Sequence, residues 1–122
     1  MDLHESGEMY LETILLLKNK NKIVRSIDVA NSLNYSKPSV SRAMKILKEA
    51  NLIVIDNKGY IDFTDEGRLV AQKVYNRHVV LTDFLSYIGV SQDQAENDAC
   101  RIEHIISEET YVCLKEYLKK QL

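Results

Sequence analysis

The chain has 122 residues, of which 45% are hydrophobic and 28% charged, with one proline and four glycines. This composition excludes a disordered chain. It indicates an ordered, helix-rich protein. The length allows either one compact core, or a small module followed by a helical extension that a partner must cover. The net charge of −2 conceals a separation, because residues 18–60 carry nine Lys or Arg against three Asp or Glu. A basic segment suits a polyanionic partner, although a solvated lysine-rich surface would give the same count.

The sequence contains no segment typical of membrane insertion or of disulfide-rich secreted proteins. The longest aliphatic run, Ile14 to Leu17, is far too short to span a bilayer. The two cysteines, Cys100 and Cys113, lie thirteen positions apart and outside any Cys-x-x-Cys pair. We therefore expect a cytoplasmic protein with free thiols and no membrane partner.

Three helices are expected in the first part of the chain. Apolar residues at helical spacing predict a helix from Glu8 to about Lys18. Ser26 is expected to cap a second helix that ends near Leu33. Ser36 is expected to cap a third, with Pro38 in its first turn, where the missing N–H of proline costs nothing.

The third helix has two chemically different faces. Its buried stripe is expected to contain Val40, Ala43, Met44 and Leu47. The residues expected to face outward are Lys37, Ser39, Ser41, Arg42, Lys45 and Lys48. A short helix, a tight turn and a basic-polar helix together predict a helix-turn-helix motif that reads DNA.

A β-hairpin is expected directly after this helix. Two β-rich runs, Leu52 to Ile55 and Tyr60 to Phe63, flank the turn sequence Asp56-Asn57-Lys58-Gly59. A hairpin behind a recognition helix predicts the wing of a winged-helix domain. The residues that we expect to contact DNA are Ser36, Lys37, Pro38, Ser39, Ser41, Arg42, Lys45 and, at the wing, Lys58.

The second half of the chain is predicted to be helical. Thr64 is expected to start a long helix that ends near Ile88, Ser91 to start another with a capping box, and Ser107 to cap the last. The predicted apolar faces consist of Leu69, Val70, Val74, His78, Leu81 and Leu85 in the first of these, and Ala95, Ala99, Ile102, Ile105 and Ile106 in the second. Because the long helix has too little chain around it to be buried alone, we expect a homodimer with these helices as its interface.

Cys100, Glu103 and His104 are the most informative residues of the chain. Their i, i+3, i+4 spacing predicts three potential metal ligands on one face of one helix. A thiolate, a carboxylate and an imidazole together suit a late first-row divalent ion rather than calcium or magnesium. Three protein ligands are too few for such an ion. Candidates to complete the set, each equally well interpreted as a packed core residue, are Met9, Glu12 and His78.

The predicted fold class is therefore mainly α. An N-terminal winged helix-turn-helix domain at residues 1–64 is followed by a helical dimerisation and metal-binding domain at residues 65–122. No catalytic residues and no enzyme are expected, because the sequence has no His-Glu-x-x-His motif, no glycine-rich phosphate loop and no Gly-x-Ser-x-Gly elbow.

Three stretches of the sequence carry a resemblance to a known family. They are Glu8-Met9-Tyr10-Leu11-Glu12, Ser36-Lys37-Pro38-Ser39-Val40-Ser41 and Asp98-Ala99-Cys100-Arg101-Ile102-Glu103-His104. With these stretches the chain resembles, from about Glu8 to about Leu118, the diphtheria-toxin-repressor family of iron- and manganese-dependent repressors. The resemblance implies a homodimer whose metal-loaded form binds palindromic double-stranded operator DNA and represses metal-uptake genes.

The resemblance also implies a mixed ligand set. The activating site of the family's iron branch matches Met9, Cys100, Glu103 and His104, and ligands of the manganese branch match Glu12 and His78. Sulfur at two positions favours Fe(II), with Mn(II) as the alternative and Zn(II), Co(II) or Ni(II) able to bind in vitro. The iron branch's second site is not expected, because the chain has Thr82 and Glu96 where that site has Glu and His. The SH3-like third domain of longer relatives is not expected either, because the sequence ends at Leu122.

A mechanism follows as a hypothesis. An ion held jointly by the first helix and by Cys100, Glu103 and His104 would tie the DNA-binding half to the dimerising half. It would thereby fix the separation of two recognition helices, which must match major grooves about 34 Å apart. The alternative is a winged-helix regulator that senses an organic ligand or a thiol oxidant through Cys100 without metal.

Overall fold

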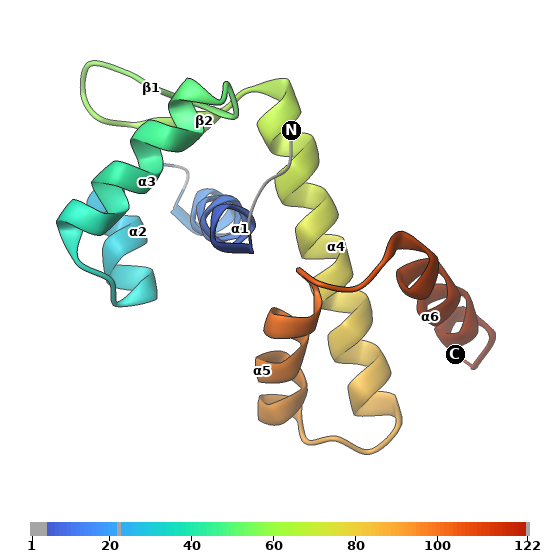
Figure 1. The fold of residues 1–122 in the computed structure, drawn as a ribbon. Coiled ribbons are helices and arrows are strands. Elements are labelled where there is room, and N and C mark those ends of the chain that lie inside the picture. The colour runs from blue at the N-terminus through green and yellow to red at the C-terminus, as the bar shows by residue number, and fades with distance from the viewer. Residues whose placement is uncertain (1–4, 22, 122) are drawn as a thin grey trace. The chain divides into compact units, whose positions relative to one another are not determined.

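The computed structural model describes residues 5–21 and 23–121. Its elements, in chain order, are α1 (Glu5–Asn21), α2 (Ser26–Leu33), α3 (Lys37–Glu49), β1 (Ile53–Ile55), β2 (Ile61–Phe63), α4 (Asp65–Tyr87), α5 (Gln92–Ile102) and α6 (Glu108–Gln121) (Figure 1). The predicted mainly α fold class is confirmed. The chain divides into two compact units, Met1–Gln72 and Lys73–Leu122, with the division inside α4.

The first unit is built around α1, α2 and α3, which contact one another. Leu11 and Ile14 of α1 are completely buried, as are Val29 of α2 and Val40 of α3. α1 is longer than predicted at both ends. The predicted cap of α2 is wrong by one residue, because Arg25 is the N-cap and its backbone N–H donates to Oδ2 of Asp28 at 2.8 Å.

α3 begins as its sequence predicts. Oγ of Ser36 accepts a hydrogen bond from the backbone N–H of Ser39 at 3.3 Å, and Pro38 lies in the first turn. The turn before it contains Asn34 in the left-handed conformation, with φ of 58°. Asparagine tolerates this conformation better than most residues, so the chain can reverse sharply between α2 and α3. The result is the predicted helix-turn-helix.

The hairpin pairs β1 with β2 in antiparallel register, with Val54 opposite Asp62. The N–H of Ile61 also donates to the carbonyl of Val24 at 2.7 Å, which links the hairpin to the segment before α2. The predicted wing is therefore present, with each strand shorter by one residue than its sequence pattern.

The start of α4 packs tightly against the end of the helix-turn-helix module. Oγ1 of Thr64 accepts from the N–H of Gly67 at 3.0 Å and donates to the carbonyl of Asn51 at 2.8 Å. A Cβ atom at Gly67 would overlap with the backbone carbonyl of Leu52. Gly67 is therefore a point of close backbone approach between α4 and the segment that enters β1.

In the second unit, α5 and α6 flank the C-terminal part of α4 (Figure 1). Its buried hydrophobic residues are Val74, Leu81, Ala95, Ala99, Tyr111 and Leu118. The rings of Phe84 and Tyr117 meet edge to face with centroids 6.2 Å apart, which ties α6 to α4. Oγ of Ser107 caps α6, as predicted, by accepting from the N–H of Thr110 at 3.1 Å.

Three details of the predicted helical half are wrong. Leu69, expected on the apolar face of α4, is 73% exposed. Ser91 occupies the N-cap of α5, but its side chain makes no capping hydrogen bond. α5 ends at Ile102, so Ile105 lies beyond the helix and is 73% exposed. Among residues 5–21 and 23–121, none of the helices combines the length and apolar composition that a membrane span requires.

Candidate nucleic-acid interface and metal centre

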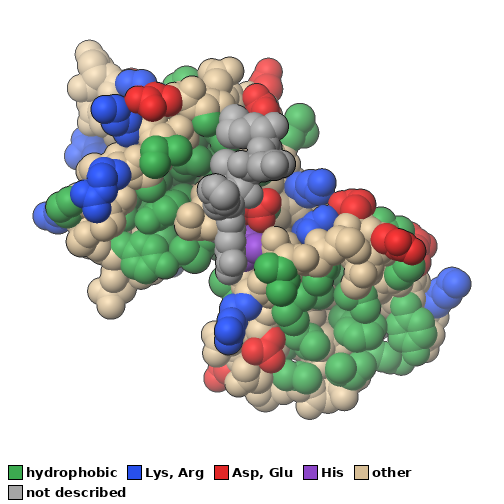
Figure 2. Space-filling model, in the orientation of Figure 1, with side chains coloured by type: hydrophobic (Ala, Val, Ile, Leu, Met, Phe, Trp, Pro, Cys, Tyr) green, Lys and Arg blue, Asp and Glu red, His purple; other side chains and the backbone are tan. Residues whose placement is uncertain are grey.

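The outward face of α3 is mainly polar and basic, although Ile46 is also exposed. Lys and Arg side chains stand out from the part of the first unit where α3 is drawn (Figure 2). The predicted DNA contacts on or next to this helix are exposed, except for the partly buried Ser39; they are Ser36, Lys37, Pro38, Ser39, Ser41, Arg42 and Lys45. Because Val40, Met44 and Leu47 hold the opposite face in the core, the exposed face is fixed in orientation.

A hydrogen-bonded chain orders the first turn of α3. Oγ of Ser36 donates to Oγ of Ser39 at 2.9 Å, and a terminal nitrogen of Arg42 donates to the same Ser39 oxygen at 3.3 Å. The guanidinium of Arg42 is thereby held over the N-terminal turn, with its other N–H groups unused by these contacts. A recognition helix reads base edges with residues near its N-terminus, so this arrangement suits a DNA reader.

The wing turn presents Lys58. Oδ1 of Asp56 accepts from the backbone N–H groups of Lys58 and Tyr60, both at 2.9 Å, and Gly59 follows with φ of 84°. Both features tighten the turn, because a carboxylate closes the loop and glycine adopts a positive φ without steric cost. Lys58 is exposed at the tip of the wing.

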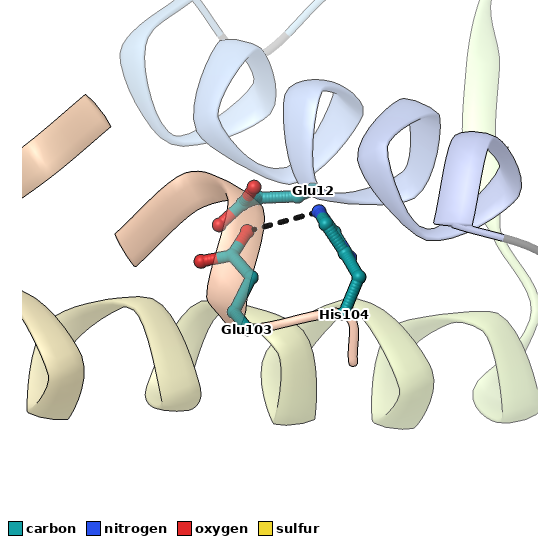
Figure 3. Close-up of side chains that lie close together, drawn as sticks. All are labelled: Glu12, Glu103 and His104. Atoms are coloured by element: carbon teal, nitrogen blue, oxygen red, sulfur yellow. Dashed lines mark ion pairs between the residues drawn. The ribbon is translucent and has the colours of Figure 1, made fainter. Parts of the chain in front are cut away.

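A buried carboxylate between two imidazoles is the main chemical feature of the second unit. Oε2 of Glu103 lies 2.8 Å from Nδ1 of His78, and Oε1 lies 3.3 Å from Nε2 of His104. The side chain of Glu103 is completely buried, that of His104 is 2% exposed and that of His78 is 25% exposed. Figure 3 marks the ion pair between Glu103 and His104; Glu12, also labelled there, belongs to α1 in the first unit.

The backbone at this site differs from the prediction. Only Cys100 lies inside α5, whereas Glu103 is its C-cap and His104 lies in the turn that follows. Glu103 keeps nearly helical dihedrals, φ −57° and ψ −24°, and its N–H still bonds to the carbonyl of Ala99 at 2.9 Å. The prediction that one helix carries all three ligands is therefore wrong, because Glu103 and His104 lie at the end of α5 and in the turn after it.

The remaining predicted ligands are placed as follows. Cys100 is a free, partly buried thiol one turn before Glu103. Met9 is half-buried in α1, with its sulfur 4.0 Å from the hydroxyl of Tyr35. Glu12, one turn further along α1, is buried. The structure thus brings both His78 and His104 to Glu103, and the metal roles of all six residues remain predictions.

Sequence reasoning missed Arg77, which precedes His78 on α4. Its terminal nitrogens donate to the carbonyl of Ile106 at 2.8 Å and to a carboxylate oxygen of Glu108 at 2.9 Å. The only sequence signal was an arginine within a helix that was predicted to be partly buried, and this signal does not identify a partner.

The donor set fits a transition metal. Two imidazoles and a carboxylate, with a thiol one turn away, combine nitrogen, oxygen and sulfur donors that bind Fe(II), Mn(II) or Zn(II) better than calcium or magnesium. Burial of Glu103 matters because a carboxylate removed from water requires positive charge or hydrogen bonds around it. A winged helix-turn-helix unit followed by a helical unit with such a cluster defines a class of DNA-binding regulators.

Comparison with known proteins identifies the family. The sequence model described as the iron-dependent repressor N-terminal DNA-binding domain matches residues 2–61. The model described as the iron-dependent repressor metal-binding and dimerisation domain matches residues 64–121. The chain therefore belongs to the family of iron-dependent repressors.

Relatives and solved structures agree with this assignment. The transcriptional regulator MntR of Escherichia coli O157:H7 is 33% identical, over 91% of this chain and 72% of that protein. The diphtheria toxin repressor of Corynebacterium diphtheriae is 30% identical, over 97% of this chain but only 53% of that protein. A manganese-dependent transcriptional repressor, solved as its complex with manganese, has the same fold, with a TM-score of 0.86 at 24% identity, over 93% of this chain and 52% of that one. The chain thus spans about half the length of several proteins that it matches.

Proposed function

We propose that this chain is a metal-dependent transcriptional repressor of the cytoplasm. As a homodimer loaded with Fe(II) or Mn(II), it binds palindromic double-stranded operator DNA and controls metal-uptake genes. The comparisons favour this role over a metal-independent regulator that senses an organic ligand or a thiol oxidant. The matching family models, one relative and one solved structure are named as iron- or manganese-dependent repressors.

The observation that carries the proposal is the contact of buried Glu103 with His78 and His104, at 2.8 and 3.3 Å. A purely structural ion pair would have the same geometry. Family membership favours the metal role, because the same segment matches a domain named for metal binding.

In the proposed site, His78, Glu103 and His104 bind the ion together with Cys100, and Met9 and Glu12 complete the ligand set. A bound divalent cation would supply the positive charge that holds all of its ligating side chains together. Because Met9 and Glu12 belong to the DNA-binding unit, their participation links metal occupancy to the orientation of that unit. Metal can favour the DNA-binding orientation of that unit only if the ion binds this orientation more tightly than the others. A change in their population ratio from 1:99 to 99:1 requires a difference in binding free energy of about 5.5 kcal/mol.

The chain's own surface supports the remaining parts of the proposal. The exposed face of α3 and Lys58 supply the polar and basic groups that phosphates and base edges require. The second unit exposes large hydrophobic side chains, which include Tyr87, Ile105, Val112 and Tyr117. Hydrophobic side chains gather on the face of this unit that Figure 2 shows. Such a surface suits burial in a homodimer.

We favour Fe(II) because Met9 and Cys100 offer sulfur, while Mn(II) prefers oxygen donors. Zn(II), Co(II) or Ni(II) would bind in vitro, since late first-row ions generally bind such sites more tightly.

The test is anaerobic DNA binding by chelator-treated full-length chain. An operator is first selected from random duplexes with Fe(II)-loaded protein, and fluorescence anisotropy then follows its binding as Fe(II) or Mn(II) is added. We expect enrichment of a palindrome and an operator affinity at least about tenfold higher with metal, a difference of 1.4 kcal/mol. Equal binding by stripped and loaded protein would contradict the proposal, and a response to peroxide that Cys100→Ser abolishes would favour the thiol sensor.

A further inference from the structure

The geometry points to Arg77 as a positioning residue, which we infer holds the turn that carries Glu103 and His104 in its metal-binding conformation. The inference rests on the proposed metal site and adds a residue that is not itself a ligand.

Arg77 contacts both ends of the turn. One terminal nitrogen donates to the backbone carbonyl of Ile106 at 2.8 Å and approaches that of Glu103 at 3.4 Å. The other donates to Oε2 of Glu108, the first residue of α6, at 2.9 Å. His104 lies between the two anchored carbonyls in sequence, so a single guanidinium fixes the segment that carries two proposed ligands.

The chemistry of the contact requires arginine. The last carbonyl groups of a helix lack partners within it, and a positive charge near them is favourable because of the helix dipole. The planar guanidinium provides several N–H donors in a rigid fork, whereas a lysine ammonium is a single flexible point charge. Arg77 therefore bonds to two carbonyls and one carboxylate at the same time.

Burial strengthens the two contacts with backbone carbonyls, whereas the side chain of Glu108 is 57% exposed. The side chain of Arg77 is 13% exposed, and its guanidinium lies over the ring of Tyr111, 5.4 Å from the centroid. A hydrogen bond from a charged donor in such a place is stronger than one in water. Loss of the side chain would leave the carbonyls of Glu103 and Ile106 without this donor, and the turn would be free to adopt other conformations.

Arg77 also shares its helical turn with His78. Two consecutive residues of α4 therefore contact the turn: Arg77 bonds to its backbone, and His78 contacts the carboxylate of Glu103. Residues that orient metal ligands without binding the ion typically change metal affinity by about 10- to 100-fold when replaced.

Lys73 provides a matched control. It lies one turn before Arg77 on α4, and its ammonium contacts the same carboxylate, Oε2 of Glu108, at 3.5 Å. Its side chain is 63% exposed, and no contact of Lys73 with the turn is found in the described part of the chain. Lys73→Gln thus removes the same charge as Arg77→Gln from the same helix.

The experiment is a Mn(II) titration of full-length chelated protein, read by the electron paramagnetic resonance signal of free Mn(II). We expect Arg77→Gln to raise the Kd for Mn(II) by about 10- to 100-fold, Arg77→Lys to recover only part of that loss, and Lys73→Gln to stay within about twofold of the parent. The Co(II) absorption spectrum of Arg77→Gln should also differ from the parent spectrum, because a displaced turn alters coordination geometry. A merely stabilising role would lower the melting temperature of metal-free protein and leave both readouts unchanged.

The outcomes separate the two proposals. If the parent chain binds no Mn(II) or Co(II), the proposed function fails. If the parent binds and folded Arg77→Gln has the same Kd and the same Co(II) spectrum, the positioning role is wrong. Full recovery by Arg77→Lys would also overturn it, since positive charge alone would then suffice.

Discussion

Oε2 of Glu103 lies 2.8 Å from Nδ1 of His78, although the two residues are 25 positions apart in the sequence. The contact joins the end of α5 to the middle of α4, and the other carboxylate oxygen faces His104. Glu103 is therefore the residue that these two contacts share.

Glu103→Gln should abolish most metal binding. The amide has nearly the same volume but carries no charge, so it removes the anionic ligand while the imidazoles stay. We expect the Kd for Mn(II) to rise by more than the roughly 100-fold upper range for changes outside the ligand shell. Equilibrium dialysis with metal analysis measures this change. Glu109→Gln, at an exposed position of α6, is the control, and equal metal content in both variants would contradict the assignment.

The two sulfur residues should set the choice of metal. Replacing soft sulfur by carboxylate favours Mn(II), because hard oxygen donors suit that ion. The quantity to measure is the concentration of each metal that gives half-maximal operator binding. In the double variant Met9→Asp, Cys100→Glu, we expect the ratio of the Fe(II) value to the Mn(II) value to rise by about tenfold, or 1.4 kcal/mol, in favour of manganese. Cys113→Ser removes the other thiol, on the exposed surface of α6, and should leave the ratio unchanged.

Local signals predicted most of the fold. Ser36 and Ser107 cap α3 and α6, as their sequence contexts indicate, and the hairpin follows its turn sequence. Each of these features depends on a few neighbouring residues. The errors arose where tertiary packing determines where a helix ends. α5 ends at Ile102, although the apolar pattern continues to Ile106.

The candidate site was predictable only in part. Residue type and spacing nominated Glu103 and His104 as candidate ligands, because ligand chemistry is visible in side-chain identity, and the structure places the two side chains in contact. The contact of His78 with Glu103 and the role of Arg77 depend on how α4 packs against the turn after α5. Such packing has no periodic signature, so a sequence pattern could nominate His78 but could not identify its partner.

Asp62 should make stability depend on acid pH. Burial raises the pKa of its carboxyl, but the Phe63 backbone N–H, the Lys18 ammonium at 3.2 Å and Arg68 outweigh this effect and hold the pKa below its ordinary value. A lowered folded-state pKa means that the stabilisation is present above the unfolded value, about 3.9, and is lost as pH falls through the folded value.

Urea unfolding of metal-free protein tests this pH dependence. Asp62→Asn should be less stable than the parent at pH 6, and the two should converge toward pH 2. Because the Asp62 side chain is 58% exposed, the difference should not exceed about 1 kcal/mol and should shrink in high salt. A difference that stays constant between pH 2 and 6 would show that the charge of Asp62 is not responsible.

Gly67→Ala should destabilise the first unit, against the usual trend for helices. Alanine in a helix interior is ordinarily favoured over glycine by about 1 kcal/mol. At Gly67 the added Cβ would overlap with the backbone carbonyl of Leu52, so α4 or the strand entry must move. We expect a net loss of roughly 1–3 kcal/mol, measured by thermal unfolding. Ser32→Ala, at an exposed position of α2, should change stability by less than about 0.5 kcal/mol, and a stabilised Gly67→Ala would exclude the close approach.

Arg42→Ala tests whether the exposed face of α3 binds DNA. Its guanidinium is held by Ser39 over the first turn of α3, where base edges and phosphates are within reach of a recognition helix. We expect operator affinity of the metal-loaded protein to fall by about 1–3 kcal/mol if Arg42 reads a guanine. If it contacts phosphate instead, affinity should fall for all sequences alike and the salt slope should decrease by about 1 per contact. Anisotropy titrations at several salt concentrations, on the selected operator and a scrambled duplex, separate these two results.

Arg101→Ala is the control, because it removes an exposed arginine of α5 and should leave operator affinity and the salt slope unchanged. If Arg42→Ala also left both unchanged, α3 would not be the recognition helix.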